Sequence, residues 1–122
     1  MTERFSPNAR LRNRGEFKAV DAGGSRVSGR FLVLVARPNG RSTDRLGIVA
    51  SRRVGGAVVR NRAKRRLREV FRRRVVADTR GTGDEPRGLD VVAIAKTGIA
   101  SAPFDAVTAD FLAALRKLRG TR

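Results

Sequence analysis

The chain of 122 residues is strongly basic, with 28 Lys and Arg against 11 Asp and Glu, a formal net charge of +17 and a pI of about 12.0. It contains neither Cys nor His, which excludes disulfides, thiolate metal sites, imidazole catalysis and most zinc sites. Its length predicts a single domain, 1–122, with flexible ends at 1–12 and 119–122, and its 40% of apolar residues are enough for a core.

The first half of the chain predicts a short helix followed by two strands. Residues 13–22 favour a helix, which Gly23-Gly24 ends. Residues 30–37, RFLVLVAR, are nearly all apolar and predict a strand that is central in its sheet or buried on both faces. After a turn-rich loop at 38–44, residues 46–52 predict a second strand.

Residues 59–75 predict a helix with two different faces. An apolar stripe recurs at spacings of three and four, formed by Val59, Ala63, Leu67, Val70 and Phe71. Lys and Arg occupy the other faces. Because a disordered basic tail would lack such a stripe, we expect one side of this helix to dock in the core and the others to expose cations.

The last part of the chain predicts a loop, a strand and a helix. The loop spans 78–88, the strand 89–96 and the helix 104–118, with Ser101 as a cap for that helix. The apolar stripe of the terminal helix consists of Val107, Phe111, Leu115 and Leu118. The order of helix, strands, helix, strand and helix predicts an α+β fold with helices packed on a small sheet.

The charge predicts a polyanion as partner. A pI above about 9 with clustered Lys and Arg is typical of nucleic-acid binding, and a basic surface that serves only solubility is the alternative. No stretch approaches the roughly 18 apolar residues of a membrane span, and the N-terminal residues lack the apolar core of a secretory signal. We therefore expect a cytoplasmic protein.

A strand, a glycine hinge and the cationic helix follow one another directly. Arg52 and Arg53 leave the strand, Gly55-Gly56 permits a tight turn, and the helix then begins. This order places arginines, which bind phosphate through two hydrogen bonds, beside a helix N-terminus that attracts anions. Asn61 suits a 2′-hydroxyl or a base edge. Alternatively, the glycines form only a turn, Asn61 is an exposed helix residue, and the cations at 72–74 are solvated.

Aromatic residues suggest a second RNA surface. The six Phe are the only aromatic residues, and most of them should lie in the core. Phe17 or Phe31 could instead line a cleft and stack on an unpaired base, which contributes about 1–3 kcal/mol per base. Cations near the N-terminus could then follow the RNA backbone: Arg10, Arg12, Arg14 and Lys18.

Residues 45–71, RLGIVASRRVGGAVVRNRAKRRLREVF, resemble the signature of the bacterial ribonuclease P protein component, the protein subunit of RNA-based ribonuclease P. The Arg-Asn-Arg element of that family corresponds to Arg60, Asn61 and Arg62. The stretches ARLRNRGEFKAV, GRFLVLVARPN and GLDVVAIAKTGIA extend the resemblance over nearly the whole chain. The resemblance implies an α-β-β-β-α-β-α sandwich like that of a ribosomal-protein domain, with a left-handed βαβ crossover.

The resemblance also implies two RNA-binding surfaces. The residues expected to bind the catalytic RNA subunit are Arg52, Arg60, Asn61, Arg62, Lys64, Arg65, Arg66 and Arg68. The residues expected in a cleft for the single-stranded 5′ leader of precursor tRNA are Arg10, Arg12, Phe17, Lys18, Phe31, Ser51 and Arg53. Two positions at which the family often has cleft aromatics are here Asp21 and Leu34, so we expect weaker stacking and a larger electrostatic contribution.

The chain is expected to supply no catalytic side chain, to bind no metal and to need no cofactor of its own. Its carboxylates are scattered, and two-metal phosphodiester chemistry needs two ions held together. The resemblance assigns the Mg²⁺ ions to the RNA, which implies an accessory subunit, monomeric when free, in the endonucleolytic removal of 5′ leaders. A non-catalytic RNA-binding protein of the ribosomal type is the main alternative. A DNA-binding basic helix, a protein-only nuclease and a membrane-surface helix are disfavoured.

Overall fold

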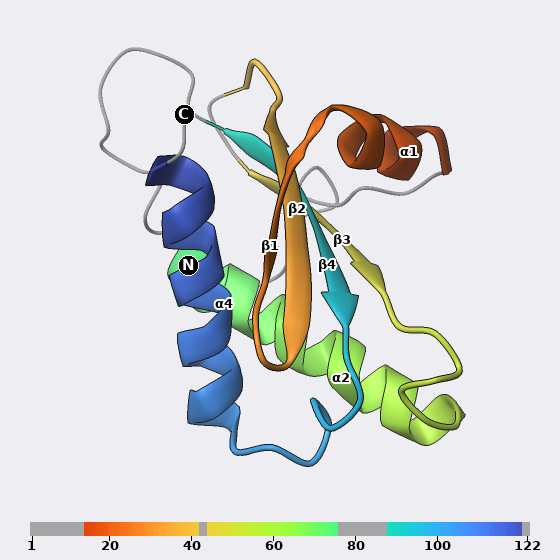
Figure 1. The fold of residues 1–122 in the computed structure, drawn as a ribbon. Helices are drawn as coiled ribbons and strands as arrows, with labels where there is room; N and C mark the ends of the chain where they lie inside the picture. Colours follow the sequence, from red (N-terminus) through yellow and green to blue (C-terminus); the bar gives the residue numbers. More distant parts are fainter. Residues whose placement is uncertain (1–13, 42–43, 76–87, 121–122) are drawn as a thin grey trace, which may run out of the picture.

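The computed structural model describes residues 14–41, 44–75 and 88–120. The elements are α1 (Arg14–Gly23), β1 (Ser25–Ser28), β2 (Leu32–Pro38), β3 (Arg45–Val49), α2 (Ala57–Val70), the π-helical turn η2 (Phe71–Val75), β4 (Leu89–Ala95) and α4 (Phe104–Gly120). Since η2 directly continues α2, this order confirms the α-β-β-β-α-β-α arrangement and the α+β class (Figure 1).

The strands form one mixed sheet in the order β1-β2-β4-β3. The central strand β2 is antiparallel to β1 and to β4, whereas the edge strand β3 is parallel to β4. The position of β2 confirms the prediction made from its apolar run, because a central strand covered on both faces has no reason to alternate. The connection from β3 through α2 to β4 forms the βαβ unit. The left-handed sense of this crossover stays a prediction.

Helices cover the two faces of the sheet unequally. The main core lies between the sheet and the helices α2 and α4, where Leu34, Leu67 and Phe111 are fully buried. Among the described residues, α1 alone lies on the other face (Figure 1), and its small core cluster consists of Val20, Val35 and Val92. One face is therefore closed by two helices, and the other is covered by one short helix.

Three local predictions differ from the structure. Strand β1 was not expected from the residue pattern, and only the family resemblance implied a third strand before the basic helix. Ser101 does not cap α4, because its hydroxyl donates to the carbonyl of Gly98, and the carbonyl of Pro103 accepts the first helical hydrogen bonds. Val59 is 38% exposed and falls outside the buried stripe, whereas Ala63 and the later members are buried. The predicted loop at 78–88 and the flexible ends lie almost wholly outside the described residues.

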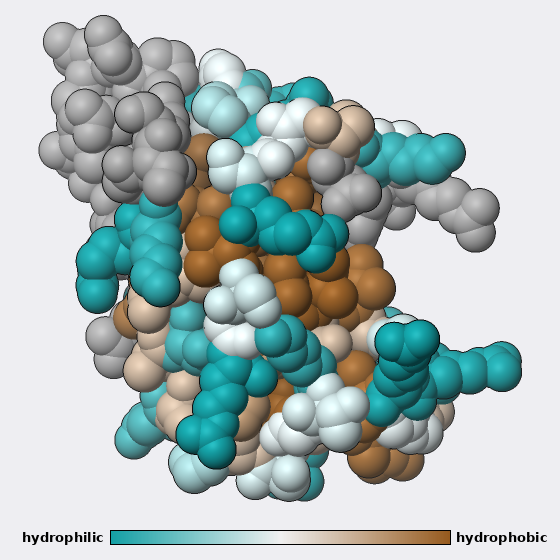
Figure 2. All heavy atoms as spheres, viewed as in Figure 1, coloured by the Kyte–Doolittle hydropathy of each residue, from teal (hydrophilic) through white to brown (hydrophobic). Residues whose placement is uncertain are grey.

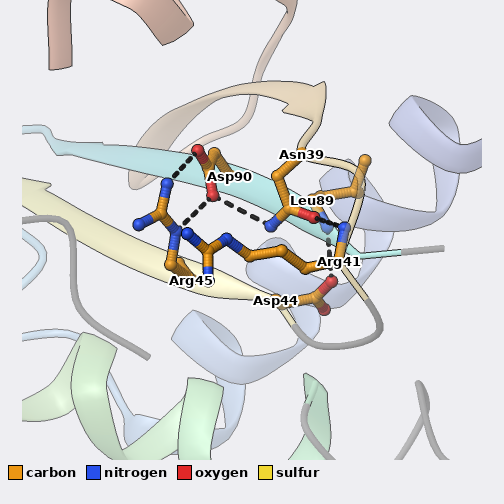
Figure 3. Close-up of polar contacts among 6 residues, drawn as sticks. All are labelled: Asn39, Arg41, Asp44, Arg45, Leu89 and Asp90. Carbon is orange, nitrogen blue, oxygen red and sulfur yellow. Dashed lines mark hydrogen bonds and ion pairs between the residues drawn. The ribbon is translucent and has the colours of Figure 1, made fainter. Parts of the chain in front are cut away.

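A polar network fixes the loop between β2 and β3 to the start of β4 (Figure 3). The buried carboxylate of Asp90 accepts hydrogen bonds from Arg45 Nε and Nη2, at 2.8 and 2.7 Å, and from Asn39 Nδ2 at 2.9 Å. Burial opposes ionisation, but the hydrogen bonds from Arg45 and Asn39 outweigh it and hold the pKa of Asp90 below its usual value. Next to it, buried Asp44 accepts from the backbone N–H of Leu89 at 2.8 Å. These contacts hold the start of β3 against the start of β4.

Candidate nucleic-acid interface

A short turn sets the start of the basic helix α2. The N–H of Val54 donates to the carbonyl of Ser51, and Val54 is buried in the core. Gly55 has φ +152, and a Cβ there would lie 2.8 Å from the side chain of Val59. Gly56 then precedes the first helical turn with an extended backbone. A glycine is therefore required at position 55 in order to turn the chain from β3 into α2.

The outward face of α2 collects cations. The buried stripe of Ala63, Leu67 and Val70 docks the helix in the core. Asn61, Arg62, Arg65 and Arg68 are exposed, and Arg60, Lys64 and Arg66 are half-buried. Since residues three and four apart share a helix face, the structure brings Asn61, Arg65 and Arg68 onto one surface. We call the exposed residues Asn61, Arg62, Arg65 and Arg68 the basic face.

One predicted RNA contact has a structural partner. Arg66 Nη1 donates to the carbonyl of Ala102 and, at 3.4 Å, to that of Ile99. These hydrogen bonds tie α2 to the segment that precedes α4. The assignment of Arg66 to RNA stays a prediction, but its packing role distinguishes it from exposed Arg65.

The single carboxylate of α2 separates the basic face from the cations that follow. Glu69 Oε2 lies 2.5 Å from Arg72 Nη2 and also pairs with Arg73 Nε. The hydrogen bond from Arg72, with the charges of both arginines, holds the pKa of Glu69 below its usual value although burial opposes this. Arg72 and Arg73 are therefore partly neutralised, which favours the interpretation of these cations as the solvated end of the helix.

The N-terminus of α2 adds positive charge to the same surface. Its first turn contains no acidic residue, and the N-cap residue Gly56 has no side chain that could cap the helix. Arg52 and Arg53 are exposed directly before it. The hydroxyl of Thr97 donates to the carbonyl of Arg53 at 3.2 Å, which holds this turn next to the end of β4. The predicted proximity of strand-end arginines and a helix N-terminus is thus present.

A second surface lies on the α1 face of the sheet. Strand register aligns four residues across all strands: Ser28 pairs with Val33, Val33 with Ile94, and Ile94 with Val49. The next row, which contains Val35 and Val92, is buried under Val20 of α1. The first row is more open, because Val33 and Ile94 are only half-buried and Val49 is 37% exposed. We call Ser28, Val33, Ile94 and Val49 the open row.

Hydrophobic atoms reach the surface beside α1 and are bordered by hydrophilic ones in the space-filling view (Figure 2). Ser51 lies two residues after Val49 of the open row, and its side chain is exposed. The side chains of Arg53 and of Lys18, which belongs to α1, are exposed as well. Of these three residues predicted for the leader cleft, Ser51 and Arg53 lie in the turn that follows β3, and Lys18 lies on α1.

Phe31 and Leu34 do not join the open row. Phe31 packs against the main core cluster and not against the cluster under α1. Leu34 is fully buried in the main core, so the expectation that it stands at a cleft position was wrong. In a strand, a shift of one residue moves a side chain to the opposite face. The side chain of Phe17 and all of Arg10 and Arg12 lie outside the described part of the chain.

The sequence interpretation missed Val33, Val49 and Ile94. The signal that could have found them is the alternation of side chains along each strand, since Val33 shares its face with Val35 and Ile94 shares its face with Val92. Cross-strand register is also needed, and this cannot be obtained from one strand alone. Within the described residues no helix is long and apolar enough to cross a bilayer, and no group of three or more His, Cys, Asp or Glu could hold a metal ion.

Comparison with known proteins supports the features above. The family model described as Ribonuclease P matches residues 5–119. The ribonuclease P protein component of Syntrophomonas wolfei is 33% identical over 109 residues, which cover 89% of this chain and 86% of that protein. The corresponding protein of Chloroflexus aurantiacus is 39% identical over 109 residues, which cover 88% of this chain and 76% of the relative.

Solved structures agree with the sequence relatives. The RNase P protein from Thermotoga maritima matches with a TM-score of 0.73 at 32% identity, over 88% of this chain and 96% of that one. The RNase P protein of Staphylococcus aureus shares the fold, with a TM-score of 0.70 over 88% of this chain and 93% of that one, at 24% identity. The match of the family model over nearly the whole chain, together with these relatives, shows that the chain belongs to the ribonuclease P protein family.

Proposed function

We propose that the chain is the protein subunit of ribonuclease P, and that it binds two RNA segments on opposite faces of its sheet. The basic face of α2 binds the catalytic RNA subunit. The open row and its border bind the single-stranded 5′ leader of precursor tRNA. The observation that supports this most is the placement of a cationic helix face on one side of the sheet and an accessible apolar row on the other.

The basic face suits structured RNA. Guanidinium groups of Arg62, Arg65 and Arg68 can each donate two hydrogen bonds to a phosphate, and Asn61 can donate to or accept from a 2′-hydroxyl. Each phosphate contact releases counterions, so binding weakens with salt by a log–log slope of about −0.7 to −0.9 per contact. We propose the catalytic RNA and precursor tRNA as the partners, and a monomer as the state of the free protein.

The open row suits a single strand without strong base preference. Val33, Ile94 and Val49 are aliphatic, and their side chains can cover sugar and base edges but cannot stack as an aromatic ring does. Lys18 and Arg53 at the border supply charge for the phosphates. Leader binding in this chain therefore depends on electrostatics more than on base stacking.

The protein leaves the chemistry to the RNA. Hydrolysis of a phosphodiester by metal ions needs ligands that hold those ions together, and the RNA phosphates supply them for Mg²⁺. The chain itself binds no cofactor in this proposal. Its role is to neutralise RNA charge, to stabilise the folded ribozyme and to hold the leader. We propose that it does so in the cytoplasm, together with its substrate.

Binding of the catalytic RNA to matched variants tests this proposal. The variant Arg62→Gln/Arg65→Gln removes two positive charges from the basic face, and Arg116→Gln/Lys117→Gln removes two from exposed positions on α4. We expect the first variant to bind the catalytic RNA at least about tenfold more weakly with a smaller salt slope. The second should keep nearly wild-type affinity. Equal losses in both variants would mean that net charge, and not the basic face, determines binding.

A further inference from the structure

The turn between β1 and β2 is held by a carboxylate from α4. The backbone N–H groups of Arg30 and Phe31 donate to the two oxygens of Asp110, at 2.9 and 2.8 Å. A Cβ at Gly29 would lie 2.6 Å from each of these oxygens, so only glycine leaves room for the carboxylate. Asp110 therefore uses both oxygens on the backbone of the turn.

Lys96 holds the same turn from the other side. Its Nζ donates to the carbonyl of Gly29 at 2.6 Å and to the hydroxyl of Ser28 at 2.8 Å. The backbone N–H of Lys96 donates to the carbonyl of Phe31 at 2.9 Å. The backbone N–H of Gly29 donates to the carbonyl of Leu32 at 2.7 Å. A turn with this many hydrogen bonds to distant residues is fixed in conformation, and so is the direction in which Arg30 leaves it.

The side chain of Arg30 is exposed and already oriented. Its guanidinium carbon lies 5.4 Å from the ring centroid of Phe31, and Phe31 is half-buried against the main core. Among the side chains that the structure describes, Arg30 forms no ion pair with a carboxylate. A guanidinium held over a ring keeps its N–H edge available, and little conformational entropy remains to be lost on binding an anion.

The register places the β1–β2 turn, which carries Arg30, next to the β1 end of the open row. Ser28 belongs to that row through its pairing with Val33, and Arg30 follows two residues later in the turn. Lys96, which donates hydrogen bonds to the turn, likewise lies two residues after a member of the open row, Ile94. A strand of RNA that lies along the open row therefore passes the turn that presents Arg30.

We infer that Arg30 binds a backbone phosphate of single-stranded RNA on the open row, and that Asp110 is a positioning residue for this contact. Planar guanidinium donors match two phosphate oxygens, and the ligand is a phosphodiester of the 5′ leader. Asp110 never touches the RNA, because its carboxylate is directed to the backbone of the turn. This inference rests on the proposed function, since it takes the open row as the leader site.

Equilibrium binding to the reconstituted holoenzyme tests the contact. The ligands are precursor tRNA with a long single-stranded leader and the same tRNA without a leader. We expect Arg30→Gln to weaken binding of the precursor about fivefold, to reduce the magnitude of its salt slope by about 0.7, and to leave mature tRNA unaffected. Arg116→Gln, which removes one exposed charge from α4, serves as the control and should change neither ligand.

A double-mutant cycle tests the positioning role. Asp110→Asn keeps the size of the side chain but has one acceptor oxygen, so one N–H of the turn loses its partner. We expect it to weaken precursor binding in the wild-type background and to have little further effect in the Arg30→Gln background. A purely structural residue would instead weaken binding equally in both backgrounds, which would overturn the positioning role. If Asp110→Asn does not fold, the exposed Arg30→Gln variant still tests the contact.

Failure of the inference differs from failure of the proposed function. If the wild-type holoenzyme prefers precursor over mature tRNA but Arg30→Gln keeps that preference and the salt slope, the phosphate contact at Arg30 is excluded. If the wild-type holoenzyme shows no preference for the precursor, the open row is not the leader site, and the inference is overturned with it.

Discussion

The carboxylate of Asp90 and the guanidinium of Arg45 form a two-point ion pair, with hydrogen bonds of 2.8 and 2.7 Å between neighbouring parallel strands. Both side chains are largely buried, at 4% and 16% exposure. The pair fixes one end of β3, and the other end of β3 leads into the turn that carries Arg52 and Arg53. The pair thereby helps to hold the strand that leads into two cations of the proposed RNA surfaces.

The first prediction concerns the loss of this pair. Asp90→Asn should lower the free energy of unfolding by about 3 kcal/mol at neutral pH, because it leaves the guanidinium of Arg45 without its buried counter-charge. Urea unfolding followed by circular dichroism measures this. Asp105→Asn, which removes an exposed carboxylate from α4, is the matched control and should change stability little.

The same carboxylate predicts a pH dependence. Because the pKa of Asp90 is lower in the folded chain than in the unfolded one, its contribution to stability is complete above the unfolded pKa of about 3.9. It is lost as the pH falls through the folded value. Wild-type stability should therefore decrease below about pH 4 more steeply than that of Asp90→Asn. Parallel curves for the two proteins would contradict this assignment.

Two adjacent glycines should respond differently to alanine. Gly55→Ala introduces a side chain at φ +152 and against Val59, so we expect a loss of about 1–3 kcal/mol. A Cβ at Gly56 meets nothing within 4 Å, and Gly56→Ala should cost less than about 1 kcal/mol. Thermal unfolding of both variants measures the difference. Equal losses would show that the turn does not need its left-handed residue.

Neighbouring arginines on α2 should also have opposite phenotypes. Arg66→Ala removes hydrogen bonds to the carbonyls of Ala102 and Ile99 and should reduce stability by about 1 kcal/mol. Arg65→Ala should leave stability nearly unchanged and weaken binding of the catalytic RNA. Unfolding and RNA binding measured on the same two proteins separate these effects. A larger binding loss for Arg66→Ala at full stability would make Arg66 part of the basic face.

A negative charge introduced into the open row tests the leader site. Val49→Glu places a carboxylate at a partly exposed position where an RNA backbone is expected to pass, and should weaken binding of precursor tRNA by about tenfold. Mature tRNA should bind as before. Ala109→Glu adds the same charge at an exposed position of α4 and controls for net charge. A similar effect of both substitutions would remove the open row as the specific site.

Patterns with a clear period made most of the fold predictable. The apolar run of β2, the strand β4 and the stripes of α2 and α4 each bury a continuous surface, and such surfaces leave a signal in the sequence. Strand β1 gives almost none, because three of its four residues are exposed and its stability comes from pairing with β2. Its existence depends on a neighbour, which no local pattern contains.

The two proposed RNA surfaces differ in how far the sequence could predict them. The basic face follows from helical spacing within one segment, so its members were found together. The open row assembles residues from four strands, and the choice between Val33 and Leu34 depends on a register that only the folded sheet defines. The contact of Arg66 with Ala102 likewise joins segments that are distant in the sequence, so it could not be predicted from the sequence.

The most direct test of the account is cleavage of precursor tRNA at low Mg²⁺ in four mixtures: buffer, protein alone, catalytic RNA alone, and protein with RNA. The account predicts substantial cleavage only where protein and RNA are both present, with a loss in Arg62→Gln/Arg65→Gln. Cleavage by rigorously RNA-free protein would contradict a subunit without catalytic groups. Cleavage by the RNA that the protein leaves unchanged, with the RNA shown to be active at high Mg²⁺, would contradict its role as the activating subunit.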